Sequence, residues 1–258
     1  MTHTQMAVFG IAFVFLMTSL GAALVFCFKK ELPHRINAIL LGGASGIMIA
    51  ASIWSLLLPA IEQAGQEWGD FAFIPIGLGF IFGGLFLLIL DKLSPCFLAK
   101  KQQGKNLSRA SKLFLAVTLH NIPEGLAVGF AFGSAYALGS TSAFIAAVGL
   151  AVGIGIQNFP EGAAVALPIK GVTESKLKGF LFGAASGIVE PIFALIGLFL
   201  SAYLQPLQTW LLAFSAGAMM FVVAEELIPE ANANGATAST AWGLMIGFLI
   251  MMILDVSL

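Results

Sequence analysis

The chain has 258 residues, of which 59% are hydrophobic and only 10% are charged, and its formal net charge is −1. Soluble domains usually contain about 25% charged residues, so this composition excludes an ordinary soluble protein. The apolar residues come in blocks of about 20, the length that an α-helix needs to cross the hydrocarbon core of a bilayer. Cys27 and Cys96 are isolated, which argues against a disulfide framework and against a thiolate metal site. We therefore predict an all-α integral membrane protein.

Apolar runs separated by polar or turn-rich breaks predict eight transmembrane helices in a single transmembrane domain covering residues 1–258. The first run has neither a preceding basic segment nor an evident cleavage site, so we expect a retained helix and not a signal peptide. The longest break, residues 92–110, includes a stretch at 100–109 expected to be a flexible polar loop. The expected spans are about 6–28, 36–61, 72–91, 111–134, 141–169, 177–202, 207–230 and 237–257.

The basic residues alternate between breaks. All 12 lie in the first, third and fifth breaks, whereas the second carries Glu62, Glu67 and Asp70. Cytoplasmic loops of membrane proteins are enriched in Lys and Arg, so these odd breaks are expected to be cytoplasmic. Eight spans then place both termini outside the cytoplasm, in a multi-pass protein of the cell (inner or plasma) membrane.

Two near-identical motifs lie in the fourth and fifth spans: HNIPEG at residues 120–125 and QNFPEG at residues 157–162. Each places a metal-binding side chain, His120 or Gln157, four residues before a glutamate, Glu124 or Glu161, so that both fall on one helix face. Ionisable side chains at membrane depth are costly and usually functional. Imidazole, carboxylate and amide donors suit zinc, iron(II), manganese or cadmium. The pair therefore predicts a metal site near the bilayer centre.

Proline and glycine in both motifs fit such a site. Each proline removes a backbone donor and distorts its helix, which is tolerated at depth where neighbours, waters or ions satisfy the freed groups. Gly125 and Gly162 permit close approach of other helices. The alternative for His120 alone is a histidine that simply hydrogen-bonds to a neighbouring helix.

A weaker similarity links the second and seventh spans. Gly46-Ile47-Met48 leads to Pro59, and Gly217-Ala218-Met219 leads to Pro229, in helices expected to cross in opposite directions. Inverted repeats around a midplane site are common in transporters, so we expect an inverted-repeat bundle. Chance similarity between helices rich in Gly, Ala and Met is the alternative.

Further acidic residues lie within the apolar spans. Glu190 falls in the middle of the sixth span without a basic neighbour. It is a candidate metal ligand, and the alternative is a protonated carboxyl group packed among helices. Glu225 and Glu226, near the cytoplasmic end of the seventh span, are candidates for a release path or simply a hydrated helix end. Asp255, near the other end of the eighth span, is a candidate for the entrance.

On these motifs the chain resembles the Zrt/Irt-like (ZIP) family of divalent metal transporters, specifically the prokaryotic GufA-type branch, over essentially its whole length. The resemblance implies a binuclear centre on the fourth and fifth helices, with Glu124 and Glu161 bridging two metals. It implies a primary site made of His120, Glu124, Gln157 and Glu161, with Met48 as a further ligand. It implies a second site made of Asn121, Asn158 and Glu190 together with the bridging carboxylates.

Two departures from the family pattern matter. Gln157 stands where many members have histidine, which removes a nitrogen donor and is expected to lower selectivity for zinc. The break at residues 92–110 contains no histidine, whereas many eukaryotic members have a histidine-rich loop there. Regulation by metal binding in that loop is therefore not expected.

The sequence thus predicts a secondary transporter, not an enzyme, that moves divalent cations into the cytoplasm: zinc first, with cadmium, iron(II) or manganese as other candidates. No GxxxxGK[ST] motif occurs, which argues against ATP-driven pumping. The expected partners are the cations and the lipid bilayer, without nucleic acid, and a homodimer is compatible with this interpretation. One alternative is an intramembrane zinc-dependent hydrolase, but the chain lacks an HExxH motif. The other, a proton or organic-solute carrier, leaves His120 and Gln157 without a shared role.

Overall fold

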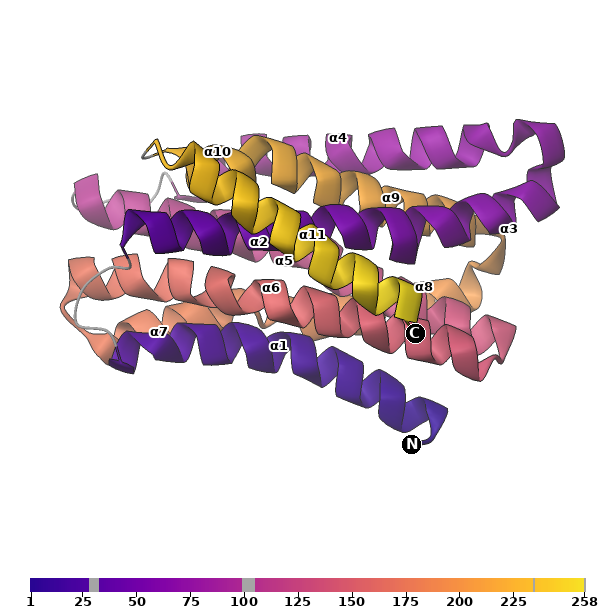
Figure 1. Ribbon diagram of the computed structural model, residues 1–258, viewed down its shortest axis with the longest axis horizontal. Coiled ribbons are helices and arrows are strands. Elements are labelled where there is room, and N and C mark those ends of the chain that lie inside the picture. The colour runs from indigo at the N-terminus through magenta and orange to yellow at the C-terminus, as the bar shows by residue number, and fades with distance from the viewer. Residues whose placement is uncertain (28–32, 99–104, 234, 258) are drawn as a thin grey trace.

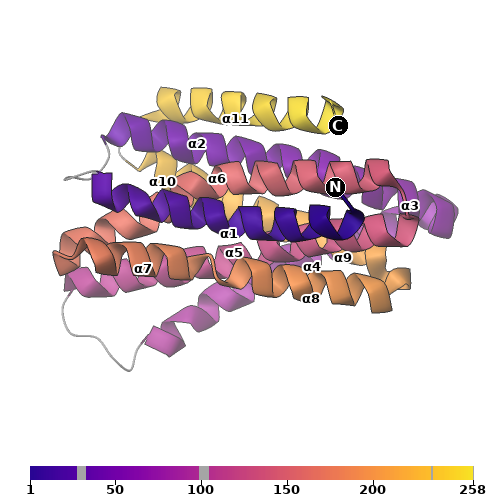
Figure 2. The same cartoon turned by 90° about the horizontal axis from the view of Figure 1, so that it is seen from below.

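The computed structural model describes residues 1–27, 33–98, 105–233 and 235–257, and within these ranges it contains helices and turns but no β-strand. Eight helical stretches in this part of the chain are long and apolar enough to cross a membrane, which confirms the predicted all-α fold and the number of spans. The helices lie side by side along the long axis of the molecule, and both chain ends lie toward the same end of the bundle (Figure 1). The view turned by 90° shows the same arrangement (Figure 2).

Most spans are single helices, and three are interrupted. The uninterrupted ones are α1 (His3–Cys27), α4 (Phe73–Leu98), α5 (Lys105–Leu138), α6 (Thr141–Thr173) and α11 (Thr237–Ser257). The second span consists of α2 (His34–Ala51), the π-helical turn η1 (Ser52–Leu57) and α3 (Leu58–Trp68), followed by the 3-10 turn η2 (Gly69–Phe71). The sixth consists of α7 (Lys176–Ser186) and α8 (Val189–Tyr203). The seventh follows the 3-10 turn η3 (Gln205–Leu207) and consists of α9 (Gln208–Val222), the π-helical turn η4 (Val223–Leu227) and α10 (Ile228–Asn232).

Two boundaries differ from the expectation. Helix α5, which contains the fourth span, begins at Lys105, so part of the stretch expected to be a flexible polar loop is helical. The second span continues past residue 61 to Trp68, because Glu, Gln and Ala in that segment are good helix formers. Glu and Gln favour a helix even where they are too polar for the hydrocarbon core. The basic residues Lys29, Lys30, Lys100 and Lys101 lie outside the described residues.

The two π-helical turns occur at equivalent places in the second and seventh spans. Each directly precedes a helix with a proline in its first two positions, Pro59 in α3 and Pro229 in α10. Proline has no backbone N–H and its ring clashes with the carbonyl four residues earlier, so it removes one α-helical hydrogen bond and distorts the helix around it. A wider π turn accommodates this break, and such turns are frequent at functional sites.

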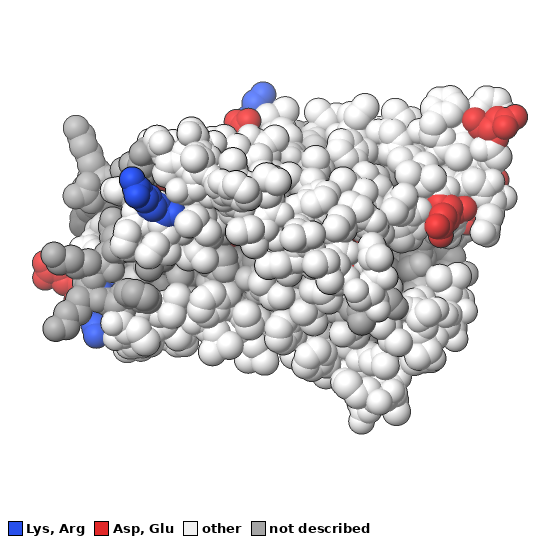
Figure 3. Space-filling model, viewed as in Figure 1, with Lys and Arg blue, Asp and Glu red and all other residues white. Residues whose placement is uncertain are grey.

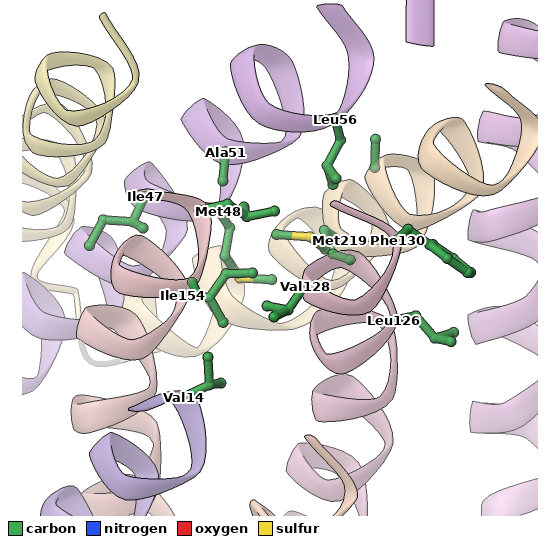
Figure 4. Packing of buried hydrophobic residues seen from close by; sticks show 14 of the residues in the cluster. Val14, Ile47, Met48, Ala51, Leu56, Leu126, Val128, Phe130, Ile154 and Met219 are labelled. Atoms are coloured by element: carbon green, nitrogen blue, oxygen red, sulfur yellow. The ribbon is translucent and has the colours of Figure 1, made fainter. Parts of the chain in front are cut away.

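The spans pack most extensively in four pairs: α1 with α6, α2 with α11, α5 with α8, and α4 with α9. The helices α5 and α6 also contact each other, and they join the two sets of pairs through contacts of α6 with α2 and of α5 with α9. Buried apolar side chains fill the space between these helices, among them Met48, Val128, Ile154 and Met219 (Figure 4). The central position of α5 and α6 therefore brings their motifs into the interior of the bundle.

The outer surface is apolar along the flank of the bundle. On the face shown in Figure 3, most of the charged side chains lie toward its two ends. Many large apolar side chains on the outer helices are exposed, including Ile81 and Phe82 on α4 and Trp242 on α11. A surface of this kind fits a lipid environment, whereas soluble monomers rarely expose apolar patches larger than a few hundred Å².

Candidate metal centre

The two motifs lie on an antiparallel pair of helices with a tight connection. α5 ends at Leu138, and Gly139 follows with a φ of 61°, a left-handed conformation that glycine adopts without strain. Thr141 then begins α6, which runs back alongside α5. Pro123 and Pro160 lie inside these helices without ending them, so each motif remains on a continuous helix.

The polar side chains of both motifs are withdrawn from the surface. Glu124, Gln157 and Asn158 are fully buried, and His120 and Glu161 are each only 5% exposed. Gln157 Nε2 donates a hydrogen bond to Glu124 Oε1 at 2.6 Å, and a second one to Asn158 Oδ1 at 3.2 Å. The two motifs, distant in sequence, therefore meet directly in the interior of the bundle.

The sixth span supplies a third acidic side chain close to the first motif. Glu190 lies in the first turn of α8 and is 1% exposed. A Cβ atom added to Gly125 would lie 2.5 Å from the backbone oxygen of Glu190, so only glycine allows α5 to approach α8 this closely. Asn121 Nδ2 donates a hydrogen bond to the backbone oxygen of Ser186 at 2.8 Å, which links α5 to the end of α7. The break between α7 and α8 therefore lies next to the first motif.

Several polar atoms of these residues are buried without a hydrogen-bond partner. Apart from His120 Nε2, which lies near Glu226, five such atoms have no partner among the described residues: Asn121 Oδ1, Glu124 Oε2, Gln157 Oε1, Asn158 Nδ2 and Glu190 Oε2. Most buried polar groups in proteins are hydrogen-bonded, so a local concentration of exceptions requires an explanation. Four of the five are oxygen atoms of carboxylate or amide groups, which are donors that a divalent cation accepts.

The structure brings Glu226, near the end of the seventh span, next to the first motif. Its Oε1 lies 2.8 Å from His120 Nε2, although the two atoms are not aligned for a hydrogen bond. Glu226 is in η4, and its side chain is 31% exposed, whereas Glu225 is in the exposed class. The residue spacing does not reveal this contact, because it depends on how the π-helical turn packs against the rest of the bundle.

The two remaining candidate residues, Met48 and Asp255, have other neighbours in the structure. Met48 is fully buried among apolar side chains, next to Val128 and Ile154 (Figure 4). Asp255, near the end of α11, accepts a hydrogen bond from Ser55 Oγ in η1 at 2.6 Å. Among the described residues, no three His, Cys, Asp or Glu side chains are already arranged as a metal cage.

Eight apolar helices around a buried cluster of carboxylates, amides and an imidazole define a multi-pass membrane protein with an internal polar site. The family described as ZIP zinc transporter matches residues 101–255. The chain is 36% identical to the zinc transporter ZIP11 of Xenopus tropicalis, over 94% of this chain and 94% of that protein. It is also 36% identical to the zinc transporter GufA of Myxococcus xanthus, over 93% of this chain and 94% of that protein. For the zinc transporter ZIPB of Bordetella bronchiseptica the identity is again 36%, over 99% of this chain and 82% of that protein.

The chain belongs to the ZIP family of zinc transporters. The family resemblance inferred from the two motifs is therefore confirmed. The family consists of transporters and not of enzymes, which rules out the alternative of an intramembrane hydrolase.

The close approach at Gly125 can be tested by substitution. In Gly125→Ala, the added methyl group collides with the backbone of Glu190, so we expect a loss of stability of about 1–3 kcal/mol, as is typical of overpacking. The matched control is Gly77→Ala in α4, where a Cβ atom would meet nothing within 4 Å. Alanine normally stabilises a helix interior relative to glycine by roughly 0.5–1 kcal/mol, so the control should be as stable as the wild type or more so. Thermal unfolding of the purified variants in detergent measures both effects, and equal melting temperatures would contradict the packing described here.

Proposed function

We propose that this protein moves divalent cations, zinc first, into the cytoplasm through a binuclear site between α5 and α6. Cadmium, iron(II) and manganese are further candidate substrates, because the donors are oxygen and imidazole nitrogen without a thiolate. The observation that supports this most strongly is the contact between the two motifs. It gathers buried carboxylates and amides whose free oxygen atoms have no hydrogen-bond partner within the described residues.

The proposed primary position uses His120, Glu124, Gln157 and Glu161, with Met48 as a further ligand. Gln157 now donates its amide to Glu124, so a cation arriving at this position competes with that hydrogen bond. Rotation of the Gln157 amide then frees Glu124 Oε1 and presents the Gln157 oxygen as a ligand. Glu226 is close enough to His120 to take part in the next step, in which the cation leaves toward the cytoplasm.

The proposed second position uses Asn121, Asn158 and Glu190, and it shares Glu124 and Glu161 with the first. Asn121 is well suited, because its amide nitrogen is held by the backbone of Ser186 and its oxygen is left free. Glu190 is buried beside the first motif and also has a free oxygen. Carboxylates that bridge two cations would reduce the repulsion between them, since each shared group carries a negative charge.

An inverted repeat is supported by the pattern of helix contacts. Exchanging the first three spans with the last three, and the fourth with the fifth, turns the pair α1–α6 into α8–α5 and the pair α2–α11 into α9–α4. All four are the extensive contacts of the bundle. The two π-helical turns before Pro59 and Pro229 follow the same exchange. We propose that the whole chain, residues 1–258, works as one transmembrane unit of this kind. A homodimer is compatible with it.

The role of the bridging carboxylates leads to a direct test. Glu161→Gln or Glu124→Gln keeps the size of the side chain but removes the charge, so zinc uptake into proteoliposomes should fall by at least about tenfold. Loss of a residue that only hydrogen-bonds to a metal ligand already lowers metal affinity or activity by about 10–100-fold. The same assay with cadmium, iron(II) and manganese ranks the substrates.

The control for this test is Glu67→Gln, an exposed glutamate at the end of the second span. It should transport zinc like the wild type. Near-normal zinc uptake by both motif variants, at wild-type amounts of inserted protein, would contradict the proposed site.

The alternation of basic residues supports an orientation with both termini outside the cytoplasm, in the cell membrane. In a background where the two native cysteines are replaced by serine, cysteines introduced at Gln66 and Ala137 should react with a membrane-impermeant thiol reagent in intact cells. A cysteine at Leu177, between Lys176 and Lys178, should react only after permeabilisation. All three positions are exposed. Labelling of Leu177→Cys in intact cells, with protection of the other two, would invert the proposed orientation.

A further inference from the structure

We propose that Thr18, on α1, is the positioning residue that orients the carboxylate of Glu190 toward the second cation position. This inference rests on the proposed function, because it assumes that Glu190 is a ligand there. None of the proposed ligands lies on α1, so the inference gives that helix a role in the site.

The geometry of the contact is that of a strong hydrogen bond. Thr18 Oγ1 donates to Glu190 Oε1 at 2.7 Å, and both residues are almost completely buried. Hydrogen bonds to a carboxylate are shorter and roughly twice as strong as those between neutral groups. The hydroxyl also lies 3.3 Å from the backbone oxygen of Val14 in its own helix. A hydroxyl has one proton, and the shorter contact to Glu190 is the one that this proton serves.

The hydrogen bond from Thr18 makes the two oxygen atoms of Glu190 different from each other. Oε1 is held by Thr18, whereas Oε2 is buried and has no hydrogen-bond partner in the part of the chain that the structure describes. A carboxylate held in this way cannot rotate freely about its terminal bond, so Oε2 keeps one direction. The arrangement favours a cation bound through one oxygen of Glu190 over a cation bound through both.

Glycines next to Thr18 allow α1 to pack closely against two other spans. A Cβ atom on Gly162, in the second motif, would overlap the backbone oxygen of Thr18. A Cβ atom on Gly187, in the break between α7 and α8, would lie 2.8 Å from Thr18 Cγ2. Two glycines on different spans thus leave room for this one residue. Thr18 therefore touches the second motif and the break that carries Glu190 at the same time.

Asn121, another proposed ligand, is held in a comparable way. Asn121 is held through its amide nitrogen by the backbone of Ser186, and its oxygen remains free. Each of these two proposed ligands has one polar atom fixed by the protein and one left without a partner. Residues that hydrogen-bond to metal ligands commonly orient those ligands in this way. Loss of such a residue typically lowers metal affinity by about 10–100-fold.

The test measures zinc binding to the purified full chain by equilibrium dialysis with metal analysis. Thr18→Val keeps the shape of the side chain but removes the donor, so the dissociation constant of the second zinc should rise by about tenfold or more, while the first is unchanged. Thr18→Ser restores the hydroxyl and should restore the affinity, which a purely structural role of the methyl group would not explain. Thr18→Ala removes the same donor without adding bulk, and it provides the measurement if the valine variant does not fold.

Two controls make the result specific. Thr240→Val changes another buried threonine, whose hydroxyl donates to the backbone oxygens of Ala231 and Ala236, and it should bind zinc like the wild type. Glu190→Ala should lose the second zinc, and adding Thr18→Val to it should have no further effect.

The outcomes separate the two proposals. If Glu190→Ala loses the second zinc but Thr18→Val and Thr18→Ala bind it with wild-type affinity, the role of Thr18 is refuted and the second position stands. If Glu190→Ala still binds two zinc ions with wild-type affinity, Glu190 is not a ligand, and both the second position and the role of Thr18 are refuted.

Discussion

The structure depends on one constraint: polar atoms buried in an apolar bundle must find partners. Each buried polar atom without a hydrogen bond costs about 1–3 kcal/mol, and five such atoms lie on four neighbouring side chains and Glu190. Their combined cost approaches the entire stability of an ordinary folded domain, which is roughly 5–15 kcal/mol. A chain of mostly Leu, Ile, Val and Phe could fill this space at no such cost. On the proposed function these donors are ligands, and the binding free energy of the cation would offset the cost.

The helix packing follows from keeping these donors close together. Gly125 lets α5 approach the backbone of Glu190, and Gly162 lets α6 approach the backbone of Thr18. Hydrogen bonds through one polar atom of Asn121, Glu124 and Glu190 then fix side chains that would otherwise rotate. The prolines contribute differently: Pro123 and Pro160 lie within helices beside the site, whereas π-helical turns accommodate the prolines of the second and seventh spans. On the proposed function, the site would combine these fixed side chains with one, Gln157, that rotates when a cation binds.

The sequence predicted the all-helical architecture, the eight spans and the residues of the two motifs, because these depend on composition and on spacing along one helix. It also singled out Glu190, since an acidic residue in an apolar run is conspicuous. It did not predict the partners of these residues. The contacts of Glu226 with His120 and of Thr18 with Glu190 join residues on different spans, and no periodicity connects them. The start of α5 at Lys105 was missed for another reason: polar residues were interpreted as a loop, although many of them form helices equally well.

The central claim is that the transported cation is held where the two motifs meet. Crystals of the protein grown with zinc or cadmium, measured at a wavelength where the metal scatters anomalously, test it most directly. The account predicts a strong anomalous peak surrounded by side chains of His120, Glu124, Gln157 and Glu161, with the Gln157 oxygen turned toward the metal. It predicts a second peak, bounded by Asn121, Asn158 and Glu190. Peaks found only at the ends of the bundle, with the hydrogen bond between Gln157 and Glu124 still intact, would contradict it.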